Sequence, residues 1–180
     1  MKSISFESPL LPVIDSNNFE LLRVNDLSVS IAGTQIIDSV SFSLERGEIL
    51  GVVGANGSGK TTLIKAIAGL LKLDSGAISV ERVDAYNLNH NDRARIISYM
   101  PQQVESHPFT AFEAVLMGRY PHLARLQLEG TADREIAWSV MRRTGTEVFA
   151  DRRLDTLSGG ERQRVVLARV LAQQPQIFLM

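Results

Sequence analysis

Apolar and polar residues alternate in the first part of the chain, in a pattern typical of half-buried strands. The alternation covers residues 21–31 and 40–44, and it predicts two strands there. Gly33 and the segment Glu45-Arg46-Gly47 interrupt the pattern and predict turns. Residues 48–53 (EILGVV) are almost continuously apolar. This run predicts a strand buried on both faces of a parallel sheet.

Helical spacing of apolar residues follows. Residues 60–71 are predicted to form a helix whose apolar residues lie in one stripe along one face. These residues are Leu63, Ile64, Ile67, Ala68, Leu70 and Leu71. The segments 110–118, 132–143 and 160–173 are also predicted to be helical. Pro175 ends the last of them, and the apolar residues 177–180 begin another buried strand.

Composition narrows the functional classes. The 180 residues contain no Cys, which excludes disulfide scaffolds, Cys-based zinc sites and thiol chemistry. The net charge of -1 argues against a general nucleic-acid binder. No apolar run reaches the roughly 18 residues of a membrane span. Residues 1–18 lack the pattern of a signal peptide and are expected to form a flexible extension of a cytoplasmic protein. We therefore expect any membrane association to come through a partner.

A glycine-rich segment carries the strongest chemical signal. Residues 54–61 match G-x-x-x-x-G-K-[ST], the phosphate-binding loop, between a predicted strand and a predicted helix. Glycines can turn successive N–H groups inward, and the helix start adds the positive end of its dipole. Lys60 supplies a cation for the terminal phosphates, and the Thr61 hydroxyl can ligate Mg²⁺. The alternative is a glycine-rich turn with an exposed lysine. The expected nucleotide-binding residues are Gly54, Asn56, Gly57, Ser58, Gly59, Lys60, Thr61 and Thr62.

A second motif opens the helix predicted over residues 160–173. Residues 157–164 read Leu-Ser-Gly-Gly-Glu-Arg-Gln-Arg. Taken alone, Ser158 and Glu161 form a capping box that stabilises their own helix. A Ser hydroxyl and two Gly N–H groups at a helix start can also bind an anion.

Together the two motifs resemble those of the ATP-binding cassette (ABC) ATPase family. The resemblance implies an α/β P-loop core over residues 19–180, with an N-terminal antiparallel β subdomain and a helical subdomain at about 103–156. It also implies ATP and Mg²⁺ as cofactors. The signature residues would be Ser158, Gly159, Gly160 and Glu161, which close over ATP held by a second copy in a homodimer. Glu161 stands where the family most often has Gln.

Two further positions follow from the resemblance. The segment 99–103 (YMPQQ) is similar to the family's Q-loop, which makes Gln102 the candidate for completing the Mg²⁺ shell and contacting the attacking water. The alternative is a polar loop after a strand. Ile31 occupies the position where the family usually has an aromatic residue that stacks on adenine. Lys60, Gln102 and Ser158 are thus the expected catalytic set, and Thr61 and Gln102 the expected metal ligands.

Residues 115–123 (VLMGRYPHL) are similar to a stretch in importers of iron-siderophore, haem and cobalamin complexes. This similarity implies membrane-spanning permease subunits bound through the helical subdomain and, indirectly, a substrate-binding protein. It places the protein peripherally at the cytoplasmic face of the cell membrane, with no nucleic-acid partner. We expect His122 to be a loop histidine and not a metal ligand, because no second ligand lies at suitable spacing.

The family resemblance ends within a strand. Residues 177–180 are similar to the apolar half of the Walker B strand, and the Asp and Glu that follow it in the family, as well as later strands, are not in the chain. We therefore expect a truncated chain. The leading hypothesis is an importer ATPase, and the alternative is a truncated nucleotide-binding protein without hydrolysis. A soluble ATPase of translation or repair is disfavoured, because those usually carry tandem cassettes or long insertions.

Overall fold

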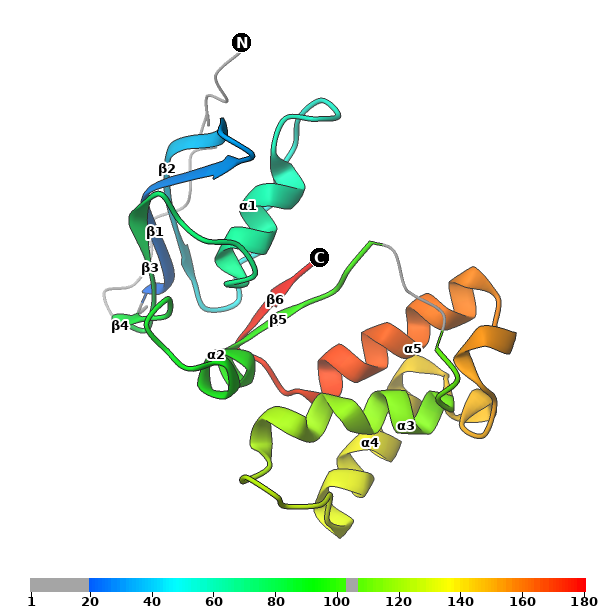
Figure 1. Cartoon of the computed structure of the whole chain (residues 1–180). Helices are drawn as coiled ribbons and strands as arrows, with labels where there is room; N and C mark the ends of the chain where they lie inside the picture. Colours follow the sequence, from blue (N-terminus) through cyan, green and yellow to red (C-terminus); the bar gives the residue numbers. More distant parts are fainter. Residues whose placement is uncertain (1–19, 103–106) are drawn as a thin grey trace. The chain divides into compact units, whose positions relative to one another are not determined.

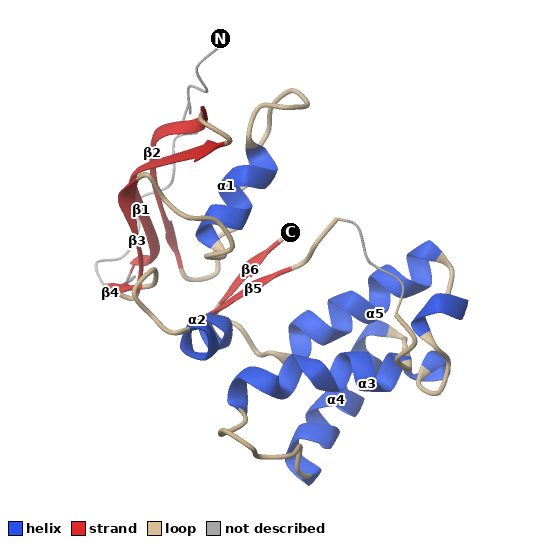
Figure 2. Cartoon of the chain, in the orientation of Figure 1, coloured by secondary structure: helices blue, strands red, loops and turns tan. Residues whose placement is uncertain are grey.

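The computed structural model describes residues 20–102 and 107–180. These residues divide after Leu88 into two compact units, which are described separately. Figure 1 shows the chain coloured along the sequence, and Figure 2 shows the same view coloured by secondary structure.

The first unit is built on an antiparallel sheet with the strand order β2-β1-β3-β4. Its strands are β1 (Glu20–Ile31), β2 (Thr34–Glu45), β3 (Ser75–Val80) and β4 (Val83–Asp84). Val24 of β1 pairs with Phe42 on one side and with Ile78 on the other. The alternation seen in the sequence therefore matches the sheet, and its buried positions include Val24, Leu27, Val29, Ile37, Ile78 and Val80.

Helix α1 (Lys60–Ile67) follows the glycine-rich segment and buries Leu63, Ala66 and Ile67. It is shorter than the predicted helix, because Gly69 adopts a left-handed conformation with φ 70°. The Leu70 N–H donates to the Lys65 carbonyl, and the Gly69 N–H donates to the Ala66 carbonyl. This glycine-centred C-terminal hydrogen-bond pattern ends the helix and leaves Leu70 exposed.

The strand predicted over residues 48–53 is wrong. The segment has no strand assignment, and Ile49 and Val53 are 98% and 84% exposed. A strand in the middle of a parallel sheet needs hydrogen-bonded neighbours. None of the described strands pairs with this segment. The apolar run shows that the segment is suited to burial, but it can be buried only when a neighbouring strand pairs with it.

The second unit contains a two-stranded parallel sheet of β5 (Ile97–Tyr99) and β6 (Ile177–Leu179), in which Ile97 pairs with Ile177. Its longer elements confirm the predicted helices. They are α3 (Ala111–Leu116), continued by the 3-10 helix η1 (Met117–His122), then α4 (Thr131–Thr144) and α5 (Gly159–Ala172). The short elements are α2 (His90–Ile96), η2 (Glu147–Phe149) and η3 (Leu154–Thr156).

Helices α3, α4 and α5 lie together, as Figure 2 shows, and their buried side chains form a common core. Val115, Met141 and Val165, one from each helix, are completely buried at its centre. Among the described residues, no helix combines the length and apolar character needed to cross a membrane.

Candidate functional site

The glycine-rich loop of the first unit owes its conformation to two glycines. Gly57 and Gly59 have φ values of 81° and 94°, which non-glycine residues rarely adopt. At Gly59 a Cβ atom would also come within 2.9 Å of Ile37 Cδ1 and 3.2 Å of the Ile36 carbonyl oxygen. Gly59 is the N-cap of α1, so this tight approach to β2 sets where the helix begins.

Lys60, the first residue of α1, lies over the loop. Its Nζ donates hydrogen bonds to the carbonyl oxygens of Gly54 and Ala55, both at 2.8 Å. These are neutral acceptors, and a phosphate oxygen carries a full negative charge. A phosphate oxygen therefore adds a charge–charge attraction to the hydrogen bond, which a neutral carbonyl oxygen does not supply. The ammonium group is therefore placed where an arriving phosphate can attract it away from the loop carbonyls.

The loop also holds donors that the protein leaves unused. The hydroxyl of Ser58 is buried and has no hydrogen-bond partner among the described residues. A Cβ at Gly54 would lie 2.7 Å from this Oγ, so only glycine leaves room for it. No side chain caps α1, so the first N–H groups of the helix keep their capacity to bind an anion. The unpaired hydroxyl, the uncapped helix and Lys60 together fit a polyphosphate.

The remaining candidates of this unit are accessible. Asn56 and Thr61 are exposed, and Thr62 is partly buried. The described residues contain no group of three or more His, Asp or Glu side chains able to hold a metal ion. A Mg²⁺ ion at Thr61 would therefore be held largely by phosphate oxygens and water, which is how Mg²⁺ usually binds with nucleotides. Ile31 is 46% exposed at the end of β1.

In the second unit, Ser158 caps α5 as the sequence predicted. The Ser158 N–H donates to Glu161 Oε2 at 2.7 Å, and the Glu161 N–H donates to Ser158 Oγ at 3.3 Å. Hydrogen bonds from the Ser158 side chain and backbone, with smaller contributions from Arg152 and Arg164, lower the pKa of Glu161. The carboxylate is therefore held in its charged form.

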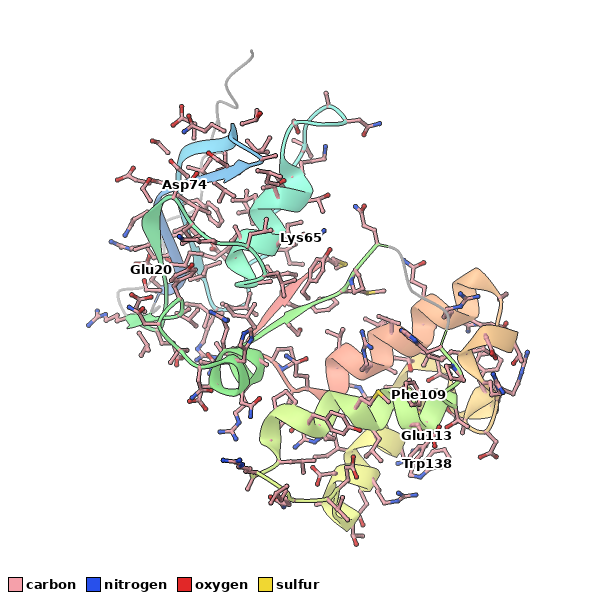
Figure 3. All side chains as sticks on the ribbon, in the orientation of Figure 1. Glu20, Lys65, Asp74, Phe109, Glu113 and Trp138 are labelled. Atoms are coloured by element: carbon pink, nitrogen blue, oxygen red, sulfur yellow. The ribbon has the colours of Figure 1, made fainter. Side chains whose placement is uncertain are left out.

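The two glycines after Ser158 are open. Both Gly159 and Gly160 are exposed, and a Cβ at either would meet nothing within 4 Å. Helix α3 starts with the same box, formed by Thr110 and Glu113, of which Glu113 is labelled in Figure 3, but continues with Ala111 and Phe112. A capping signal at Thr110 was readable as T-x-x-E in the sequence but was not identified there. The two exposed glycines thus distinguish the capping box of Ser158 from an ordinary helix cap such as that of Thr110.

Gln102 lies beyond the end of β5. The Met100 N–H donates to the Leu179 carbonyl at 2.8 Å, so pairing with β6 continues to Met100 and stops at Pro101, which has no N–H. The side chain of Gln102 is exposed. Gln103, the last residue of the Q-loop segment, lies outside the described residues. The phosphate loop and Ile31 belong to the first unit, whereas Gln102 and residues 158–161 belong to the second.

The 115–123 segment forms internal contacts of the second unit. His122 Nε2 is 2.8 Å from the carbonyl oxygen of Gln173. Arg119 is buried and donates to the Ala172 carbonyl at 2.7 Å and to Gln174 Oε1 at 2.9 Å. Sequence reasoning had not singled out Arg119, whose burial no local pattern indicates.

Comparison with known proteins gives consistent matches. Residues 37–180 match the family model described as ABC transporter. The chain is 42% identical over 160 residues to a cobalamin import ATP-binding protein of Halobacterium salinarum, covering 88% of this chain and 40% of that protein. It is 41% identical over 154 residues to a hemin import ATP-binding protein of Gloeobacter violaceus, covering 85% and 55%.

A solved structure agrees with these relatives. The inward-facing conformation of a putative metal-chelate type ABC transporter is 28% identical, with a TM-score of 0.71, over 86% of this chain and 56% of that chain. The chain thus spans about half the length of the proteins it matches. These similarities confirm the α/β fold class with an N-terminal antiparallel sheet that the sequence predicted.

Proposed function

Because the chain belongs to the ABC transporter family, we propose that it is part of the ATP-binding and ATP-hydrolysing subunit of an importer. The observation that carries the proposal is the phosphate loop, where a buried unpaired hydroxyl, an uncapped helix start and a lysine lie within eight consecutive residues. Each of these groups is a donor or a cation that the fold leaves without a stronger partner. A nucleoside triphosphate supplies the matching negative oxygens.

In this proposal the loop residues bind the phosphates of ATP. The loop N–H groups and Ser58 donate to phosphate oxygens, and Lys60 exchanges its two carbonyl acceptors for the terminal phosphates. Thr61 and Gln102 would hold Mg²⁺, which neutralises charge as the terminal phosphoryl group is transferred to water. Ile31 would cover the base with an aliphatic surface. Gly54, Gly57 and Gly59 are needed because they shape the loop.

The signature residues would act on a second copy of the chain. Ser158 and the N–H groups of Gly159 and Gly160 lie at an exposed helix start, with room for an approaching anion. Closing over ATP held in the partner's phosphate loop would use these donors. The protein's contribution to hydrolysis is then positioning and electrostatic stabilisation, as phosphoryl transfer requires.

The cargo and partners are inferred from the relatives. The matched proteins include importer subunits named for cobalamin and hemin, and a transporter of the metal-chelate type. These names support an iron chelate, haem or cobalamin as cargo. The segment 103–156 would be the helical subdomain that contacts membrane-spanning permease subunits, with a substrate-binding protein acting outside. The subunit would sit peripherally at the cytoplasmic face of the membrane.

Binding of Mg-ATP by the purified chain tests the nucleotide site. We expect saturable binding that Lys60→Ala weakens by at least tenfold, because a charge-assisted contact is lost. Lys65→Ala is the matched control, since Lys65 lies on the same helix at the opposite end (Figure 3). Equal binding by the wild type and Lys60→Ala would contradict the proposal. Hydrolysis is measured in the complete subunit with its permease, where binding without turnover would favour the alternative of a non-hydrolysing nucleotide-binding protein.

A further inference from the structure

Two arginines hold the peptide groups that come directly before Ser158. Arg152 Nη2 donates to the carbonyl oxygen of Thr156 at 3.1 Å. Arg162 Nη2 donates to the carbonyl oxygen of Leu157 at 3.0 Å. The two carbonyls that lead into the signature are therefore each bound by a guanidinium group, one from the preceding turn and one from the first turns of α5.

Arg152 is itself fixed from several directions. Its guanidinium carbon lies 5.6 Å from the centre of the Phe149 ring, and its Nη1 lies 3.8 Å from Glu161 Oε1. Its backbone carbonyl accepts a hydrogen bond from the Ala111 N–H at 2.9 Å, which ties the turn to the start of α3. The guanidinium carbon of Arg164 in α5 also lies over the Phe149 ring, 5.5 Å from its centre. The planar guanidinium thus joins η2, η3 and the first turn of α5.

The neighbouring arginine makes none of these contacts. Arg153 donates to the two carboxylate oxygens of Asp155, at 3.2 Å and 2.6 Å, and within the described part of the chain its side chain forms no hydrogen bond or ion pair with residues 156–161. Both arginines are about half exposed, and both belong to the same turn. The chain therefore offers a matched pair in which one arginine touches the signature and the other does not.

The signature has a physical need for such support. An anion site is effective when its donors are already in place before the ligand arrives. Gly159 and Gly160 have no side chains to restrict them and no packing neighbours beyond their Cα atoms, so they gain rigidity only from the residues around them. Glu161 adds a negative charge beside a site meant for an anion. The cationic groups of Arg152 and Arg164 lie close enough to offset it.

We propose that Arg152 is a positioning residue for the signature, holding the Thr156–Ser158 backbone and the Glu161 carboxylate so that the Ser158, Gly159 and Gly160 donors face a nucleotide phosphate. This inference rests on the proposed function of the signature. Arg152 itself touches no phosphate. It acts through the Thr156 carbonyl and through Glu161, so its loss displaces donors without removing them.

The experiment compares Arg152→Gln with Arg153→Gln in the complete ATPase subunit assembled with its permease. Three quantities are measured: the Kd for Mg-ATP of the isolated subunit, kcat for hydrolysis, and the melting temperature. For Arg152→Gln we expect kcat to fall about ten- to hundredfold, the cost typical of misplaced groups. The Kd, which reports the phosphate loop, stays within about twofold. For Arg153→Gln we expect both the Kd and kcat to stay within about twofold of the wild type, because this substitution displaces no donor of the signature.

Arg152→Lys serves as the second variant. Lysine keeps the charge and a single donor nitrogen but not the planar guanidinium that contacts Thr156 and Glu161 together, so we expect a kcat between those of the wild type and Arg152→Gln. Equal kcat values for Arg152→Gln and Arg153→Gln, in an active wild type, would overturn the inference and leave the proposed function standing. If both Arg152 variants lost ATP affinity, kcat and melting temperature together, the inference would also be overturned, because this pattern indicates general structural support. A wild type that neither binds nor hydrolyses ATP would instead refute the proposed function.

Discussion

Arg119 of η1 donates a hydrogen bond from Nε to Oδ1 of Asp133 in α4 at 3.0 Å, although the two side chains are only 7% and 14% exposed. The Nη1 group of the same guanidinium donates to the Ala172 carbonyl and to the Gln174 side chain. One buried cation therefore links η1, α4 and the end of α5. Asp133 also accepts from the Gly130 N–H at 3.1 Å, which caps α4.

Arg119→Met should destabilise the second unit strongly. The substitution leaves the Asp133 carboxylate buried without its main partner, and breaking a buried ion pair costs about 3–5 kcal/mol. Urea unfolding followed by the Trp138 fluorescence measures the change, because Trp138 lies on α4. Arg125→Met, at an exposed position, is the control and should shift the free energy of unfolding by less than about 0.5 kcal/mol. A similar effect in both variants would contradict this assignment.

The stability of the wild type should fall in acid partly because of Asp133. The hydrogen bond from Arg119 is the largest cause that lowers the pKa of this carboxyl. A group whose pKa is lower in the folded state stabilises the fold above its unfolded pKa, which is about 3.9 for Asp. That contribution disappears as the pH falls through the lower folded value.

The test compares the wild type with Asp133→Asn from pH 6 to pH 2. We expect the wild type to be more stable at pH 6 and the difference between the two to shrink below about pH 4. The pKa values of Glu113 and Glu161 are lowered too, but these residues are present in both the wild type and Asp133→Asn, so their contribution cancels in the difference. A pH-independent difference would show that the charge of Asp133 does not matter.

Gly118→Ala should also destabilise the second unit. A Cβ at this position would overlap the carbonyl oxygen of Arg169 in α5 and lie 3.0 Å from the Ala172 Cβ, so η1 would have to move off α5. Overpacking of this kind costs about 1–3 kcal/mol. Gly130→Ala is the control, because its Cβ meets only Asp133 Oδ2, at 3.9 Å. Thermal melting of both variants distinguishes them.

Gly59→Ala should impair nucleotide binding more than Gly57→Ala. Both glycines have positive φ values, so both substitutions strain the backbone by about 1–2 kcal/mol. Only Gly59 also lies against Ile37 and the Ile36 carbonyl, whereas Gly57 faces open space. Titration with Mg-ATP should therefore show a larger loss of affinity for Gly59→Ala. Equal losses would mean that backbone strain alone controls the loop.

Ser158→Ala and Thr110→Ala separate the two roles of a capping box. Each substitution removes a helix cap and should cost about 1 kcal/mol of stability. Only Ser158→Ala is expected to lower ATP hydrolysis by the complete subunit, because only its box is followed by open glycines. The measurements are melting temperature and kcat for both variants. Equal kcat values would reduce Ser158 to an ordinary cap.

The phosphate loop, the Ser158 cap and most helices were predictable from the sequence alone. These features depend on residues close together in the chain, such as the glycines before Lys60 or the S-x-x-E of the α5 cap, so the local sequence determines them. The predicted strand at 48–53 was wrong because its burial requires a partner strand, and helix α1 ends early because Gly69 terminates it.

The tertiary structure decided which distant residues support those local features. The pairing of Ile97 with Ile177, the burial of Arg119 against Asp133 and Ala172, and the contacts of Arg152 with Phe149 and Glu161 all join separate elements. An arginine in a polar stretch has the same local pattern whether it faces water or a carbonyl of another element. Its role depends on which backbone groups the packed helices bring within hydrogen-bond distance, and that is determined only when the chain folds.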